Sequence, residues 1–152
     1  MSNQEIELTA YCGLYCGDCI RYKSKAARLA RDLVRELKKV EFDKYAEVKS
    51  LSMKEFQYYK QCYEALEAIA KLQCVSGCRL GEGYPTFSCK IIKCCQGKGF
   101  KGCWDCAEFE KCQEFEFLKP FHGDAPLQNL RKIRELGLGG WTEYRQKFYV
   151  WQ

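Results

Sequence analysis

Apolar residues recur at intervals of three and four along two stretches of the chain, and this spacing predicts amphipathic helices. One helix is expected from about residue 23 to 40, with an apolar stripe of Ala26, Leu29, Ala30, Leu33, Val34 and Leu37. A second is expected to begin near Ser52, because Ser52 and Glu55 have the spacing of a capping box. Its stripe is Phe56, Tyr59, Tyr63, Leu66, Ile69 and Ala70. Cys62 lies near this stripe, so we expect it to be buried as a small apolar residue.

Regular patterning fades between residues 74 and 112, which hold eight of the twelve cysteines and six of the twelve glycines. Here the sequence predicts only a helical turn around 90–95 and a helix from about 105 to 118. Further on, Asp124 as N-cap and Pro126 in the first turn predict a helix that ends near Gly137. A last helix is expected over about 140–149. Strand patterns are weak, so the predicted fold is mostly α: a single domain over 1–152 with an irregular, cysteine-rich metal-binding segment.

The composition narrows the possible classes of protein. Of the 152 residues, 47% are hydrophobic and 30% are charged, as in ordinary globular proteins. No apolar run approaches the roughly 20 residues that span a bilayer. The first ten residues are acidic and lack an apolar core, so we expect no signal peptide and a cytoplasmic location. The formal charge of +5 would fall to about +1 if eight cysteines were thiolates around two metal ions, so nucleic acid is not an expected partner.

Twelve cysteines can mean a disulfide framework in a secreted protein or thiolate ligands in a reducing compartment. The short spacings favour thiolate ligands, because they bring sulfurs together locally as one ion requires. Cys12, Cys16 and Cys19 form the first cluster, and its fourth ligand is expected from 74–112, which would join the two segments. Cys74, Cys78 and Cys89 either complete this site or form a third one.

The second predicted cluster has Cys103 and Cys106 at its centre and Cys112 one to two helical turns further on. Cys94 or Cys95 would complete it. Only one of these adjacent residues is expected to be a ligand, because their side chains diverge.

All-sulfur sites suit zinc and iron–sulfur clusters alike, and the short glycine-rich spacings favour zinc over a [4Fe–4S] cluster. The spacing of Cys12, Cys16 and Cys19 also matches that of radical S-adenosylmethionine enzymes, but those build barrels of about 200 residues or more. A thiol oxidoreductase would need a βαβ unit around Cys103 and Cys106, and no such pattern is present. The only histidine, His122, lies in a turn and is expected to be a capping or surface residue. No catalytic set emerges, which favours a role other than that of an enzyme.

An ordered series of motifs resembles one cysteine-rich prokaryotic family of unknown function. The motifs are Tyr11-CGLYCGDC-Ile20, Gly77-Cys78, the run from Cys89 to Cys94, Lys98-Gly99, Cys103-x2-Cys106-Ala-Glu-Phe, and the tail from Leu130 to Gly137 followed by Trp141. The resemblance covers roughly residues 10–145 and implies metal binding, with zinc as the metal, but no established reaction. The ligands that it implies are Cys12, Cys16, Cys19, Cys74, Cys78, Cys89, Cys94, Cys103, Cys106 and Cys112. Two features depart from the family pattern: Cys74 and Cys78 stand one residue further apart, and Cys95 is an additional neighbour of Cys94.

The sequence therefore predicts a structural metalloprotein that acts as an adaptor or interaction module. Its partner is unidentified and is expected to be another protein rather than a membrane. The alternative is an iron–sulfur protein with a redox or electron-transfer role.

Overall fold

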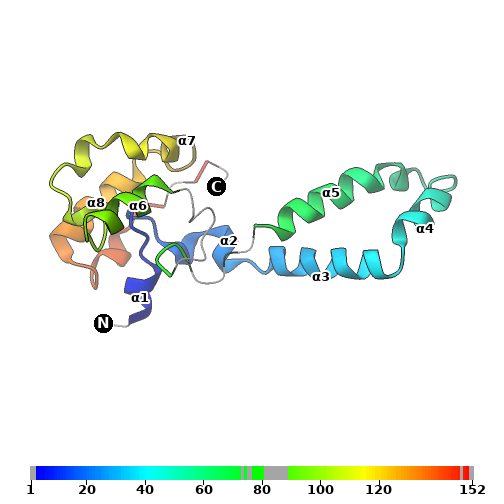
Figure 1. The fold of residues 1–152 in the computed structure, drawn as a ribbon, viewed down its shortest axis with the longest axis horizontal. Helices are drawn as coiled ribbons and strands as arrows, with labels where there is room; N and C mark the ends of the chain where they lie inside the picture. The colour runs from blue at the N-terminus through cyan, green and yellow to red at the C-terminus, as the bar shows by residue number, and fades with distance from the viewer. Residues whose placement is uncertain (1–2, 73, 75–76, 81–88, 148, 151–152) are drawn as a thin grey trace. The chain divides into compact units, whose positions relative to one another are not determined.

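A computed structural model describes residues 3–72, 74, 77–80, 89–147 and 149–150 of the chain. The chain forms two compact units, one made of 1–22 with 74–152 and the other of 23–73 (Figure 1). We call them the cysteine unit and the hairpin unit. The expectation that 1–152 forms a single domain stays a prediction.

The described residues form eight α-helices and six short 3₁₀ helices and contain no strand, which confirms the predicted mostly α fold. The α-helices are α1 (Asn3–Leu8), α2 (Ile20–Lys23), α3 (Ala26–Lys39), α4 (Phe42–Lys49), α5 (Tyr59–Ala70), α6 (Lys90–Gly97), α7 (Lys119–His122) and α8 (Ala125–Leu136). The 3₁₀ helices are η1 (Cys16–Asp18), η2 (Lys54–Tyr58), η3 (Cys103–Asp105), η4 (Phe109–Lys111), η5 (Gln113–Leu118) and η6 (Trp141–Tyr144). None of the described helices is both long enough and apolar enough to cross a bilayer.

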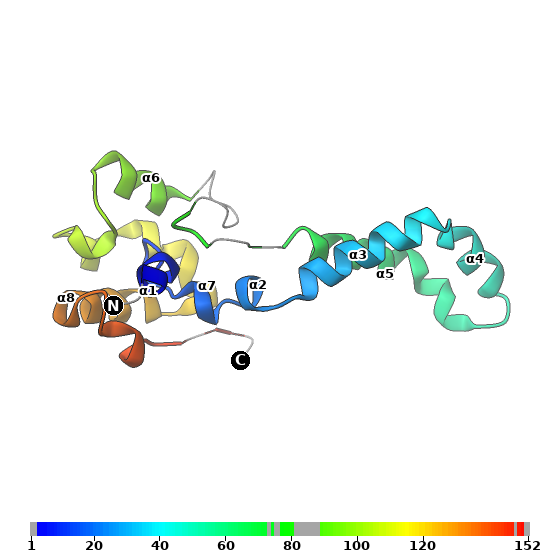
Figure 2. The same ribbon diagram turned by 90° about the horizontal axis from the view of Figure 1, so that it is seen from below.

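The hairpin unit consists of α3 and α5 side by side, joined through α4 and η2 at one end (Figures 1 and 2). The helical conformation is interrupted at Glu41, which adopts a left-handed conformation with φ of 49° and so separates α3 from α4. Aromatic rings pack together at the end of the hairpin where α4 and η2 join the two helices. The ring centroid of Phe42 lies 5.6 Å from that of Tyr59 and 6.1 Å from that of Phe56. The sequence analysis did not predict α4.

Two expectations for the hairpin unit are wrong. The hydroxyl of Ser52 donates to the carbonyl of Lys49 at 3.2 Å instead of capping a helix, and the predicted second helix begins as η2 before α5. Cys62 is exposed rather than buried, because the half-buried apolar residues of α5 are on another side of the helix, namely Tyr59, Tyr63, Leu66 and Ala70, and the predicted stripe member Ile69 is exposed like Cys62.

The core of the cysteine unit gathers around α8, which packs against η3 and η6. Its buried apolar members are Ile91, Trp104, Phe109, Phe115, Leu130, Ile133 and Trp141. The helices α6 and α8 confirm the predictions for 90–95 and for the segment between Asp124 and Gly137.

The predicted helices over 105–118 and 140–149 are wrong. Cys106 and Cys112 have extended backbone angles, with ψ of 122° and 121°, and these angles split the first segment into η3, η4 and η5. In the second segment only η6 is helical among the described residues, because Arg145 is extended, with ψ of 139°.

Candidate metal centre

The first cysteine cluster begins in a tight turn. The amide of Ala10 donates to the carbonyl of Leu14 at 2.8 Å, and the amide of Gly13 donates back to the carbonyl of Ala10 at 3.0 Å. Gly13 has φ of +85°, and a Cβ there would lie 2.9 Å from the carbonyl oxygen of Pro126. Glycine is therefore required for the turn that carries Cys12 to pack against α8.

Both Cys-x2-Cys segments use the same backbone device. The amide of Cys19 donates to the carbonyl of Cys16 at 3.0 Å across η1, and the amide of Cys106 donates to the carbonyl of Cys103 at 3.0 Å across η3. In a 3₁₀ turn the side chains at i and i+3 are eclipsed. In the first turn this spacing suits a shared ion, whereas the thiols that bear on Cys103 are those of Cys95, Cys12 and Cys112.

Gly77 and Cys78 lie directly against Cys16. Gly77 has φ of +75°, and a Cβ there would lie 3.1 Å from the Cys16 sulfur. The Cys78 thiol donates a hydrogen bond to Cys16, which lowers the pKa of Cys16 to about 7 and raises that of Cys78. Segments far apart in the chain therefore bring their sulfurs into contact.

Cys74 completes a group of four around this contact. Its thiol is near Cys16 and Cys19, its pKa is raised mainly by burial, and the Gly77 amide donates a hydrogen bond to its sulfur. Amides that point at sulfur favour the thiolate. We call Cys16, Cys19, Cys74 and Cys78 the first cysteine group.

A second group surrounds Cys103. The sulfurs of Cys95 and Cys103 lie 3.6 Å apart, far beyond the roughly 2.05 Å of a disulfide bond. Two sulfurs bound to one tetrahedral zinc at about 2.3 Å would lie about 3.8 Å apart. The pKa of Cys103 is raised by its hydrogen bond with Cys95, by burial and by the nearby Cys12 and Cys112. The second cysteine group is therefore Cys12, Cys95, Cys103 and Cys112.

A cavity of about 240 Å³ lies beside the first cysteine group. Five cysteines line it, namely Cys12, Cys16, Cys19, Cys78 and Cys89, and most of the remaining wall is apolar. His122 and Tyr149 also line it, with their ring centroids 5.1 Å apart. His122 is the last residue of α7, where the sequence predicted a turn, and it is half-buried in this wall; its capping role stays a prediction.

The structure distributes the predicted ligands unevenly. Cys12 lies between the two groups, since its charge bears on both Cys78 and Cys103, and burial raises its own pKa to about 12. Cys106 is half-buried against the core. Cys94 is exposed, and its neighbour Cys95 takes the place beside Cys103. None of the twelve cysteines forms a disulfide.

The sulfurs of each cysteine group lie near one another but do not surround a common centre. In the described part of the chain, no three His, Cys, Asp or Glu side chains are positioned so that they could hold a metal ion without moving. The chemistry of the donors nevertheless fits one class of ion, because sets made entirely of sulfur select zinc, copper(I) or iron–sulfur clusters over hard cations.

Arg79 is a residue that the sequence analysis missed. Its Nε donates to the carbonyl of Thr9 at 3.0 Å and its Nη1 donates to the carbonyl of Lys101 at 2.9 Å. The guanidinium also lies 4.7 Å from the ring centroid of Tyr11. Its positive charge lowers the pKa of both Cys16 and Cys95, so the same side chain stabilises a thiolate in each cysteine group. Its buried Nη2 has no hydrogen-bond partner among the described residues.

Asp18, inside the Cys16–Cys19 turn, is a second residue that was missed. Its carboxylate accepts hydrogen bonds from Nε of Arg145 at 2.6 Å and from Nη2 at 2.9 Å. Only 16% of the Asp18 side chain and 20% of the Arg145 side chain are exposed. This bidentate ion pair holds the Cys16–Cys19 turn against the C-terminal segment that contains Arg145.

The fold and the site define a small helical protein with a buried centre rich in thiols. The chain belongs to the family described as protein of unknown function DUF3795, whose model matches residues 8–117. The matched range contains all twelve cysteines and the whole hairpin unit. Neither a search of curated proteins nor a search of solved structures found a match.

Proposed function

We propose that the protein binds metal through two sites made of cysteine thiolates, and that zinc is the metal. The first site consists of Cys16, Cys19, Cys74 and Cys78. The second consists of Cys12, Cys95, Cys103 and Cys112. The contact of Cys78 with Cys16 carries the proposal, because it completes a Cys-x2-Cys turn with a sulfur from a distant segment. Cys89 lines the cavity beside the first group, and Cys106 packs against the core that contains Cys95 and Cys103.

Several buried thiols would have to lose their protons to bind metal. Burial raises the pKa of Cys12 to about 12 and contributes to the raised pKa of Cys78 and of Cys103. A cation opposes this penalty, because a coordinating thiol is deprotonated outright. Two sites with four thiolates each would carry a net charge of about −2 apiece. Arg79 lies where it can offset part of that charge.

The role that we propose for the metal is structural. The described part of the cysteine unit consists of short helices and turns, and the two sites would fasten 12–19, 74–78 and 95–112 to each other. Structural zinc contributes on the order of 10 kcal/mol of folding free energy at neutral pH. In this account the protein is an adaptor or interaction module whose metal ions hold its shape.

An iron–sulfur cluster with a redox role is the second candidate, and the cavity is the observation that favours it. A cavity of about 240 Å³ lined by five cysteines offers more room and more donors than a single ion needs. Iron–sulfur clusters are held by cysteine thiolates, usually four.

Purification under anaerobic, reducing conditions followed by elemental analysis tests the proposal. We expect a colourless protein with about two zinc ions per chain, because eight thiolates supply two tetrahedral sites. Stoichiometric iron, with visible absorption that bleaches on reduction, would favour the cluster instead. A folded protein that contains neither zinc nor iron would refute both candidates.

A further inference from the structure

The hairpin unit lacks a core of large buried side chains. Among its described residues only Ala27, Ala30 and Ala46 are buried. Helical hairpins gain most of their stability by packing an apolar face against another element. A unit of two helices that buries only alanines therefore leaves apolar surface available for a partner.

One exposed apolar row begins at the end of η2, follows α5 and ends just beyond it. It consists of Tyr58, Cys62, Ala65, Ile69 and Leu72, which follow one another at steps of four, three, four and three residues. All five are exposed. This alternation is the heptad spacing of a helix that packs against a neighbouring helix. The residues of α5 that face α3 form a different row.

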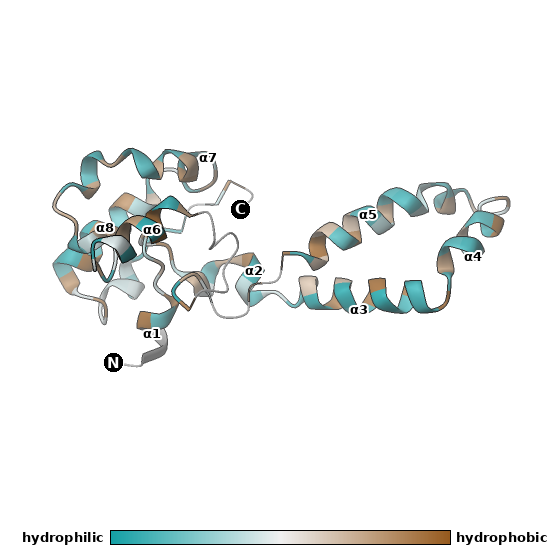
Figure 3. Cartoon of the chain, in the orientation of Figure 1, coloured by the Kyte–Doolittle hydropathy of each residue, from teal (hydrophilic) through white to brown (hydrophobic). Residues whose placement is uncertain are grey.

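A second exposed row runs along α3. Leu29 and Leu33 are one turn apart, and Val40 follows just after the helix. Figure 3 shows hydrophobic positions recurring between hydrophilic ones along both helices. The large apolar side chains of the two rows are between 38% and 66% exposed.

The two rows lie on the same face of the hairpin. Lys38 of α3 and Glu67 of α5 form an ion pair at 3.1 Å, so they mark one face. Each residue of an α-helix is rotated by about 100° from the one before it. Leu29 and Lys38 are nine residues apart, so they lie on opposite sides of α3, about 180° apart. Ile69 and Glu67 are two residues apart, so they lie about 200° apart around α5. Both apolar rows therefore point away from the ion pair, to the opposite face.

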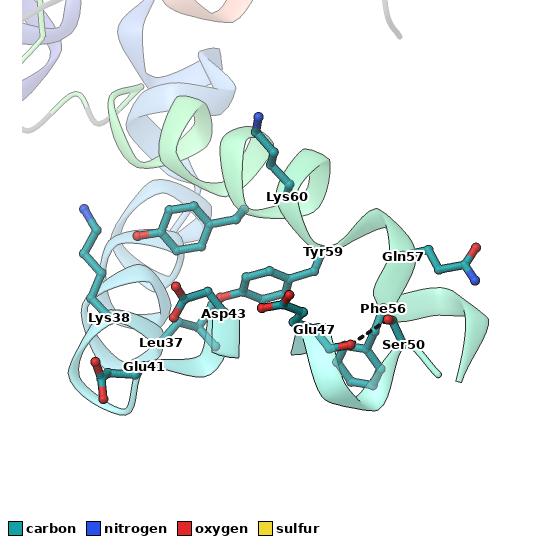
Figure 4. Close-up of a pocket in the computed structure, with 11 residues that line it drawn as sticks. Leu37, Lys38, Glu41, Asp43, Glu47, Ser50, Phe56, Gln57, Tyr59 and Lys60 are labelled. Carbon is teal, nitrogen blue, oxygen red and sulfur yellow. Dashed lines mark hydrogen bonds between the residues drawn. The ribbon is translucent and has the colours of Figure 1, made fainter. Parts of the chain in front are cut away.

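The face that carries the ion pair has a different character. Near the closed end of the hairpin a hollow of about 880 Å³ is lined by charged groups of both signs together with Leu37, Phe56, Tyr59 and Tyr63 (Figure 4). The face of the ion pair thus combines charged and aromatic groups, whereas the opposite face carries the two apolar rows.

We propose that the apolar face binds a second copy of this chain, so that two hairpins form an antiparallel four-helix bundle. The two rows run in opposite directions on one face, so a two-fold axis that lies between two such faces, perpendicular to the helices, places each row against its counterpart. A standard interface buries about 800 Å² on each partner. Nine part-exposed side chains, counting Ala26 beside Leu29, supply apolar area of that order along two helices of 14 and 12 residues.

Sedimentation of the full chain tests this interface independently of the metal sites. With reductant present, so that Cys62 cannot form a disulfide between chains, we expect a mass of twice the 17.8 kDa of one chain. The double variant Leu33→Gln with Ile69→Gln is expected to sediment as a single chain. The matched control is Arg28→Gln with Glu64→Gln, at exposed positions outside the rows, and it should stay dimeric.

Circular dichroism and metal content are measured on every variant. Unchanged helix content and unchanged metal would show that only the interface is lost. A wild-type chain that sediments as a single copy would overturn the proposal without any variant, and would leave the cysteine unit or another protein as the occupant of this face. A dimer that is equally tight in the row variant would also overturn it.

Discussion

The sulfur atoms of Cys95 and Cys103 lie 3.6 Å apart in the core of the cysteine unit, whereas Cys94, the direct neighbour of Cys95, is exposed. Two adjacent cysteines therefore have opposite environments. Because only Cys95 reaches the second group, Cys95→Ser should lose about one equivalent of bound metal per chain. Cys94→Ser provides the matched control and should keep the wild-type content. Elemental analysis of both variants checks the prediction, and equal metal in the two would contradict the assignment of Cys95.

The ion pair between Asp18 and Arg145 should contribute to stability, because both side chains are mostly buried and share two hydrogen bonds. Asp18→Asn keeps the shape but removes the charge, and it should lower the free energy of unfolding by about 2 kcal/mol. Denaturant unfolding followed by tryptophan fluorescence measures this change. The exposed pair of Glu110 with Arg131 is the control, and Glu110→Gln should have a much smaller effect. Equal losses in the two variants would show that burial adds nothing to the Asp18 pair.

Gly77 and Gly99 offer a matched test of the contact with Cys16. Both have positive φ, +75° and +68°, so alanine at either position should cost about 1 kcal/mol in backbone strain. A Cβ at 77 also meets the Cys16 sulfur at 3.1 Å, whereas a Cβ at 99 meets nothing within 4 Å. Gly77→Ala should therefore weaken metal binding, and Gly99→Ala should not. Competition with a chromophoric chelator measures the difference, and equal affinities would contradict the close approach of Gly77 to the first site.

Removal of metal should loosen the cysteine unit and spare the helices of the hairpin unit. Chelation under reducing conditions should speed hydrogen exchange at the amides of Cys19 and Cys106, whose hydrogen bonds close the two Cys-x2-Cys turns. The amides in the middle of α3 and α5 should exchange at unchanged rates, because the sites lie outside this unit. Mass spectrometry of peptides from each segment checks both parts. Unchanged exchange throughout the cysteine unit after complete removal would contradict a structural role for metal.

Local signals in the sequence predicted the helices that have local causes. Pro126 and Gly137 mark the first turn and the end of α8 whatever the rest of the chain does. The segment 105–118 shows where such signals fail. Its apolar spacing suits a helix, but Cys106 and Cys112 adopt extended angles, which the spacing of apolar residues does not encode.

The sequence predicted that the candidate site consists of cysteines, but it predicted only part of how these cysteines group in space. Cys95 could have been preferred over Cys94, because it follows Ile91 by four residues and so shares the buried face of α6. The contact between Cys16 and Cys78 could not be read from spacing, since it depends on where the chain places Gly77. Arg79 carried no signal beyond its position after Cys78, because its carbonyl partners, Thr9 and Lys101, are distant in sequence.

X-ray absorption at the edge of the bound metal tests the central claim most directly. The account predicts four sulfur neighbours at about 2.3 Å from each metal ion and no nitrogen or oxygen ligand, whether the metal is zinc or iron. A first shell containing nitrogen or oxygen would contradict the all-cysteine assignment. Absence of stoichiometric metal from the folded, reduced chain would contradict the claim that its sulfurs are gathered to bind ions.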